Sequence, residues 1–288
     1  MNATMESAPV TPQQQIYNYI VRANQLREQG SYTESEALFK QALALTEESF
    51  GSDSPAVVAV LNNYAVLCKY SGQFEEAERL YRRALPLAIR FFGEAHPEIA
   101  TLYHNLGGLD HARGRFAEGE PAARQSVEIR SRALDAGHPQ ATEAQLMADL
   151  AALAGILDGQ RKYDESEPIY IRVLAFFEHR LETGDGNAEY EIAVNLNNLA
   201  AIFASTHRAE LSEPLYARSL AIKEKLLGSS HPDVALTLNN LGVLLKSLGR
   251  RDEAAEAFRR ALAIFDETLP ADHPKRKAAQ ENYARLCE

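Results

Sequence analysis

Two histidines and an aspartate stand close enough along the chain to suggest a metal site. His104 and His111 are seven residues apart, which puts them on one face of a helix, and Asp110 lies next to His111. Zinc sites usually show a denser pattern, such as HExxH or CxxC, and this sequence contains neither. We therefore expect no metal and no cofactor.

Four further histidines each stand directly before a proline: His96, His138, His231 and His273. A catalytic histidine would not need four copies, so we expect these residues to form turns or helix caps. The sequence also lacks a Walker glycine loop, a GxSxG elbow and a GxGxxG fingerprint. These patterns predict that the protein is not an enzyme.

Asparagine recurs at a spacing that suggests a binding surface. One column holds Asn63, Asn105, Asn198, Asn240 and Asn282, spaced by 42 residues within two blocks, and Ala152 takes its place between the blocks. The positions just before this column are also polar, with Asn62, His104, Asn197 and Asn239. Because carboxamides donate and accept hydrogen bonds at once, a row of them on a concave face can hold the main chain of an extended peptide.

Asparagine in these columns could instead tie each helix to the backbone of its neighbour, since buried amides are usually satisfied within the protein. A second polar column is more than one such hydrogen bond per repeat requires. We therefore expect both columns to line a peptide-binding groove, with the structural role as the alternative.

A basic column lies one or two helical turns further along, at Arg27, Lys69, His111 and Lys246. If it shares the face of the asparagines, the groove is mildly basic and favours acidic peptides. The alternative is that these are solvated cations near helix C-termini, where the helix dipole favours positive charge.

The elements that would position these columns follow from a periodic proline. Pro55, Pro97 and Pro139 are 42 residues apart, as are Pro232 and Pro274. Apolar residues between them recur with helical spacing and predict a helix over 55–70, a turn at Gly72 and a helix over 75–91. A repeat of this length indicates an all-α fold, a right-handed α-solenoid of about six helix-turn-helix hairpins with a C-terminal capping helix.

The residues within one repeat resemble a known family. Leu238, Leu241, Gly242, Leu245, Gly249, Ala254, Phe258 and Ala261 follow the tetratricopeptide repeat signature, with leucine in place of the first tryptophan. The HP start, the LNNLG and LNNYA motifs and EAERLYRRAL look like the kinesin light chain subtype. This resemblance implies a protein-interaction role, with asparagines at the corresponding position holding peptide backbones in the inner groove.

The repeat register divides the chain into segments. We expect a disordered tail over 1–11 and a solenoid over 12–288, with repeats at 12–53, 54–95, 96–137, 138–188, 189–230 and 231–272 and a capping helix at 273–288. The third repeat should be loosely packed, because Gly119 and Ala123 replace its close-packing alanine and its aromatic residue, and Asp110 an apolar one.

Charge and composition limit the partners. Forty acidic against thirty basic residues give a net charge of −10, which disfavours nucleic acid and anionic membranes. The first fifteen residues lack a basic cluster and an apolar run, so no secretory signal is expected and the predicted location is cytoplasmic. The favoured function is a non-enzymatic adaptor or scaffold that binds a short linear peptide of a protein partner, an acidic one if the basic column shares the groove. The alternative is a self-assembly or oligomerisation module of a larger complex, which associates through the loosely packed third repeat or the end caps. The oligomeric state stays open.

Overall fold

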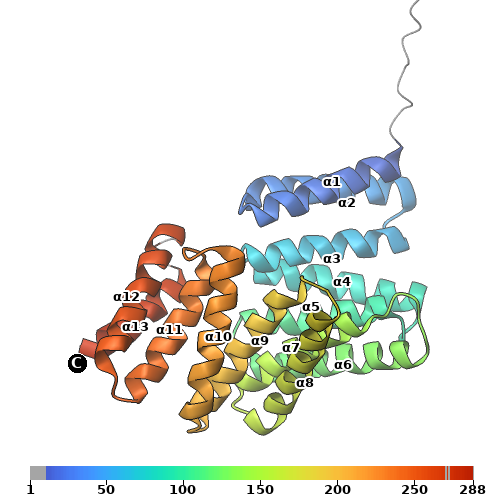
Figure 1. Ribbon diagram of the computed structural model, residues 1–288. Helices are drawn as coiled ribbons and strands as arrows, with labels where there is room; N and C mark the ends of the chain where they lie inside the picture. Colours follow the sequence, from blue (N-terminus) through green and yellow to red (C-terminus); the bar gives the residue numbers. More distant parts are fainter. Residues whose placement is uncertain (1–10, 270, 272, 288) are drawn as a thin grey trace, which may run out of the picture. The chain divides into compact units, whose positions relative to one another are not determined.

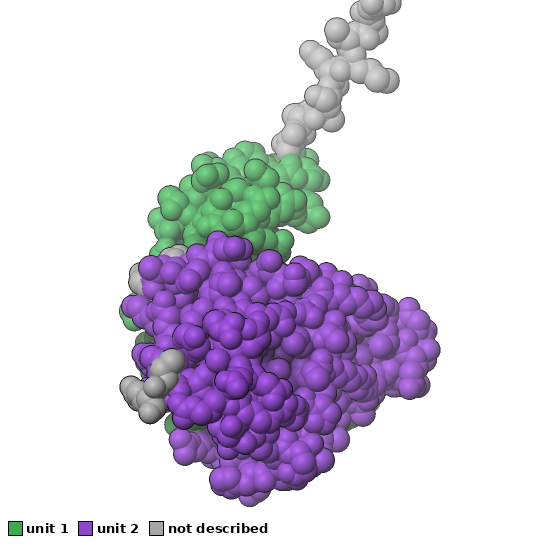
Figure 2. Space-filling view, turned by 60° about the vertical axis from the view of Figure 1, so that its left-hand side comes forward, with its two compact units in different colours: residues 1–160 green, residues 161–288 purple. Residues whose placement is uncertain are grey.

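A computed structural model describes residues 11–269, 271 and 273–287 of the 288-residue chain. Every regular element in this described part is an α-helix, which confirms the all-α prediction. The chain divides into two compact units, residues 1–160 and 161–288 (Figure 2). No helix among the described residues combines the length and apolar character needed to cross a bilayer.

Unit 1 contains seven described helices (Figure 1): α1 (Pro12–Glu28), α2 (Tyr32–Phe50), α3 (Pro55–Tyr70), α4 (Phe74–Phe92), α5 (Pro97–Ala112), α6 (Phe116–Asp135) and α7 (Glu143–Gly159). Helices α1 to α6 form three antiparallel pairs, and the first helices of the pairs also pack on one another, α1 on α3, α3 on α5 and α5 on α7. This row of first helices carries the asparagine and basic columns of the unit.

Unit 2 contains α8 (Tyr163–Glu182), α9 (Ala188–Ser205), α10 (Ala209–Leu227), α11 (Pro232–Ser247), α12 (Arg251–Thr268) and α13 (Pro274–Cys287). Its first helices likewise form a row, because α11 packs on both α9 and α13. The boundary between the units falls between α7 and α8, inside the predicted repeat 138–188.

The predicted helix boundaries agree closely with the structure, since 55–70 coincides with α3 and 75–91 lies within α4. The histidines before proline form helix caps or turns, as expected. His96, His231 and His273 directly precede α5, α11 and α13, whereas α7 begins at Glu143 with Thr142 as its N-cap, so His138 lies in the preceding turn. His96 Nδ1 accepts a hydrogen bond of 3.1 Å from the Glu98 amide, and His231 does the same for Asp233 at 3.1 Å. His138 and His273 repeat this contact. Thr11, assigned to the tail by the sequence, caps α1, while residues 1–10 lie outside the described part.

Four pairs turn through a glycine in the left-handed region, at Gly30, Gly72, Gly114 and Gly249, while Arg161 before α8 and His207 before α10 take this conformation without glycine. Gly72 has a φ of 78°, which lets the Gln73 amide reach back 2.8 Å to the carbonyl of Cys68. Small residues then permit close crossing: a Cβ added to Gly242 would lie 2.8 Å from the ring of the fully buried Phe258. The expected pairing of small with large side chains is present here.

The third helix pair differs from expectation. A Cβ added to Gly107 would lie 3.2 Å from the Ala123 backbone nitrogen, and one added to Gly119 would lie 3.1 Å from the Gly107 carbonyl oxygen. The prediction of loose packing is therefore wrong, because the two glycines let the backbones of α5 and α6 approach each other and close the space that an aromatic side chain would fill. Arg130 of α6 also donates from Nε to Asp149 Oδ2 of α7 at 2.8 Å, in a buried ion pair.

Candidate functional site

The asparagines of unit 1 lie between adjacent helices and bind to one another. Asn105 on α5 donates from Nδ2 to Asn62 Oδ1 on α3 at 2.8 Å. Asn63 donates to the Ala59 carbonyl of its own helix at 2.8 Å and accepts from Asn24 Nδ2 on α1 at 3.4 Å. The amides thus connect α1, α3 and α5. Asn24 was missed because it stands 39 rather than 42 residues before Asn63.

Unit 2 repeats the same arrangement. Asn240 on α11 donates to Asn197 Oδ1 on α9 at 3.3 Å, and Asn282 on α13 donates to Asn239 Oδ1 on α11 at 3.1 Å. Asn197 in turn donates to the neighbouring Asn198 at 3.2 Å and is only 5% exposed. In both units, members of the later column therefore donate to the earlier column of the preceding repeat, at Asn105, Asn240 and Asn282.

These hydrogen bonds between asparagines of neighbouring helices, which we call the amide ladder, bear on both roles considered from the sequence, peptide binding and structural support. The asparagines do connect neighbouring helices, but mainly through side-chain amides rather than through backbone. Each carboxamide has two donor hydrogens and two acceptor sites, so one ladder bond leaves hydrogen-bonding capacity on the half-buried members. Their role in holding a peptide remains a prediction.

His104 occupies the ladder position next to Asn105 but turns to a different partner. Its Nδ1 lies 2.9 Å from Asp149 Oδ1 on α7, and the imidazole remains one-third exposed. Asp149 is buried and also binds Arg130. The sequence did not single out this aspartate and arginine as partners of His104. The sequence feature that could have indicated this contact was Asp149 itself, a charged residue inside the apolar stretch of α7.

The basic column of unit 1 is brought together at the C-terminal ends of α1, α3 and α5. The Arg27 guanidinium lies 5.6 Å and the Lys69 ammonium 5.2 Å from the centroid of the Tyr70 ring. Burial, and then the charge of Arg27, lower the pKa of Lys69. Desolvation and the charge of Lys69 likewise lower the pKa of His111. These three basic groups are close enough to act on each other electrostatically.

The acidic surroundings of this column are sparse. Arg27 pairs with Glu28 at 3.5 Å, whereas no carboxylate among the described residues forms an ion pair with Lys69. Lys69 is half-buried, so its charge is only partly solvated. Lys246 of unit 2 differs, because its Nζ donates to the Arg285 carbonyl near the end of α13. Within the described residues, no cluster of three or more histidine, cysteine or acidic side chains is placed to hold a metal.

Antiparallel helix pairs of similar length, packed in sequence within each unit, define an α-helical repeat protein. Models of the tetratricopeptide repeat match residues 15–90, 191–267 and 99–140. Because these matches cover more than half of the sequence, the chain belongs to the tetratricopeptide repeat family. No curated protein sequence matches it.

Solved structures of kinesin light chain type are similar to this chain. A Podosopora anserina protein of this type, with nearly identical TPR-like repeats, is 21% identical with a TM-score of 0.56, covering 75% of this chain and 98% of its own. BtubC (BKLC) from P. vanneervenii is 23% identical with a TM-score of 0.59, covering 93% and 95%. NprR in complex with its cognate peptide NprX is 12% identical with a TM-score of 0.63, covering 94% and 71%.

Proposed function

We propose that this protein is a non-enzymatic interaction adaptor that binds a short, acidic linear peptide along the first helices of unit 1. Tetratricopeptide repeat arrays commonly present extended concave surfaces to protein partners. The observation that best supports an acidic ligand is Lys69, a half-buried cation between Arg27 and His111 that no described carboxylate neutralises.

The proposed mode divides the binding between two kinds of group. Half-buried amides such as Asn105 hydrogen-bond the peptide main chain, which requires no particular peptide sequence. Lys69 and Arg27 bind a glutamate or aspartate side chain, which selects acidic peptides. NprR supports peptide capture as a use of this fold, because that repeat protein was solved with its cognate peptide.

Self-association, the alternative drawn from the sequence, relied in part on a loosely packed third repeat. The close approach of α5 and α6 at Gly107 removes that support. Peptide capture is therefore the better supported function.

A peptide array probed with the full chain at two salt concentrations would first identify acidic ligands. Titration of the best peptide against Lys69→Met should then show about tenfold weaker binding, the size expected for loss of a charge-assisted hydrogen bond. Lys246→Met is the matched control, because Lys246 binds a carbonyl of α13 instead. Equal binding by wild type and Lys69→Met would contradict an acidic site at Lys69.

A further inference from the structure

Ion pairs join the second helix of one helix pair to the second helix of the next. The arginine and the glutamate that form them occupy the same positions in their repeats. Arg83 on α4 pairs with Glu47 on α2 at 2.5 Å. Arg218 on α10 pairs with Glu178 on α8 at 2.6 Å, and Arg260 on α12 pairs with Glu224 on α10 at 2.7 Å. Each pair spans the surface between two second helices.

The α2–α4 boundary carries a second bridge beside the first. Arg90 pairs with Asp53 at 3.4 Å, and Arg83 also donates to the Ser52 carbonyl at 3.2 Å. Two arginine side chains of α4 therefore reach across to α2 and to the turn that follows it.

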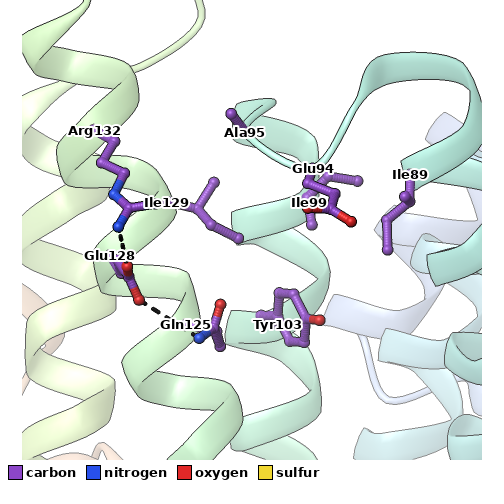
Figure 3. Close-up of a pocket in the computed structure, with 9 residues that line it drawn as sticks. All are labelled: Ile89, Glu94, Ala95, Ile99, Tyr103, Gln125, Glu128, Ile129 and Arg132. Carbon is purple, nitrogen blue, oxygen red and sulfur yellow. Dashed lines mark hydrogen bonds and ion pairs between the residues drawn. The ribbon is translucent and has the colours of Figure 1, made fainter.

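Both bridges are lost one repeat later, at the α4–α6 boundary. At the positions 42 residues on, Ile89 replaces Glu47, Gln125 replaces Arg83 and Ala95 replaces Asp53. Arg132 corresponds to Arg90 but pairs with Glu128 of its own helix at 2.5 Å. Figure 3 shows this pair and the contact from Gln125 to Glu128 along α6.

A pocket of about 370 Å³ lies where the bridges are lost (Figure 3). It is lined by Ile89 of α4, Glu94 and Ala95 of the following turn, Ile99 and Tyr103 of α5, and Gln125, Glu128, Ile129 and Arg132 of α6. Ile99 and Ile129 are buried in the fold and give the pocket an apolar floor. Its volume falls in the range of roughly 300–1,000 Å³ typical of ligand pockets.

The rim of the pocket carries an excess of negative charge. Arg132 offsets Glu128, while Glu94 is exposed and forms no ion pair with another described residue. An occupant that combines an apolar group with a nearby cation would therefore complement both floor and rim. An acidic segment of the kind proposed for the Lys69 site would be repelled here.

We infer that this pocket is a second peptide-binding site, which takes an apolar side chain of a partner protein with an arginine or lysine next to it. The apolar side chain covers Ile99 and Ile129, and the cation faces Glu94. The site uses α4, the following turn, α5 and α6 and none of the asparagine or basic-column residues, so it is independent of the peptide groove proposed above.

Isoleucine methyl NMR on the full chain tests this inference directly. The probes are three blocked peptides, Ac-Gly-Phe-Arg-Gly-NH2, the same peptide with glutamate for arginine, and the same with alanine for phenylalanine. We expect the Phe-Arg peptide to shift the methyl signals of Ile99 and Ile129 saturably. The Phe-Glu peptide should bind about three- to fivefold more weakly, as for an exposed charge pair, and the Ala-Arg peptide should cause no saturable shift.

The matched variant restores the bridges of the α2–α4 boundary through Ile89→Glu, Ala95→Asp and Gln125→Arg. It should fill the pocket, keep or raise the melting temperature and abolish the shifts at Ile99 and Ile129, whereas Lys69→Met should leave them unchanged. Absence of saturable shifts in the wild type, equal binding of the Phe-Arg and Phe-Glu peptides, or undiminished binding by a folded bridge-restoring variant would each overturn the inference. The peptide comparison on the wild type decides the question even if that variant does not fold.

Discussion

Asn105 donates a hydrogen bond from its Nδ2 to the Oδ1 of Asn62 at 2.8 Å, joining α5 to α3 through one side chain from each asparagine column. The same relationship joins Asn240 to Asn197 in unit 2. The two columns are therefore not parallel rows of free amides. Within each unit they form a ladder of hydrogen bonds, which joins the first helices and still leaves hydrogen-bonding groups for a ligand.

The ladder predicts unequal costs for two alanine substitutions. Asn198→Ala alone should lower the free energy of unfolding by less than about 1 kcal/mol, because Asn197 keeps its bond from Asn240. Adding Asn240→Ala removes both ladder partners of the buried Asn197 and should cost about 1–3 kcal/mol more. Urea unfolding of the two variants measures the difference. If the double variant is as stable as Asn198→Ala, the ladder has no structural role, contrary to the contacts seen here.

Lys69→Met should raise the pKa of His111, because it removes the neighbouring positive charge that helps to lower it. In the wild type, the unfolded chain binds the His111 proton more readily than the folded chain. This residue therefore makes stability rise with pH up to about 6.5, its ordinary pKa, and the variant should weaken that dependence. Histidine-selective NMR titration reports the pKa directly. A bound acidic peptide should also raise the pKa of His111. If that pKa is unchanged in Lys69→Met, the charge of Lys69 does not act on His111 and the prediction is wrong.

Glu191→Gln should stabilise the protein at neutral pH but not in acid. Burial raises the pKa of Glu191 above its ordinary value of 4.5, so the folded state holds this proton more tightly than the unfolded chain. Stability is lost as pH rises from 4.5 through the raised pKa, and the amide removes that loss. Solvent screening limits the gain at pH 7 to less than about 1 kcal/mol.

Thermal unfolding of wild type and Glu191→Gln from about pH 3 to pH 8 compares the two. Glu189→Gln is the control, since Glu189 pairs with Lys225 at 2.8 Å and should lose rather than gain stability at neutral pH. A gain for Glu191→Gln of the same size at pH 3 would show that the buried charge is not its cause.

Asp149→Ala should be the most damaging of these substitutions. It leaves the buried Arg130 without its carboxylate and His104 without its contact, and loss of one partner from a buried pair costs about 3–5 kcal/mol. Replacing both members, as Arg130→Met with Asp149→Leu, should recover most of that loss, which guanidinium unfolding would measure. A double variant as unstable as Asp149→Ala would show that the loss does not come from the unpaired arginine.

Local chemistry made much of the fold predictable. Residues close in sequence set where α3 begins and ends, through the proline at its start, its apolar spacing and the turn at Gly72. The predicted boundaries 55–70 therefore coincide with the helix. The packing of α5 against α6 was mispredicted, because Gly107 and Gly119 change how closely two backbones approach rather than how either helix forms.

The sequence by itself determined the helix repeat, the local role of the histidines before proline in caps or turns, and the residues that share a column, since helical periodicity and cap geometry are set within a few residues. Only the tertiary structure decided the partner of each column member. Lys69 and Lys246 share a column, yet one lies beside Arg27 and the other binds the Arg285 carbonyl. Likewise, Ile89 of α4 and Gln125 of α6, which are 36 residues apart in the sequence, line the same pocket. Such contacts depend on the distance and rotation between hairpins, which long-range packing sets.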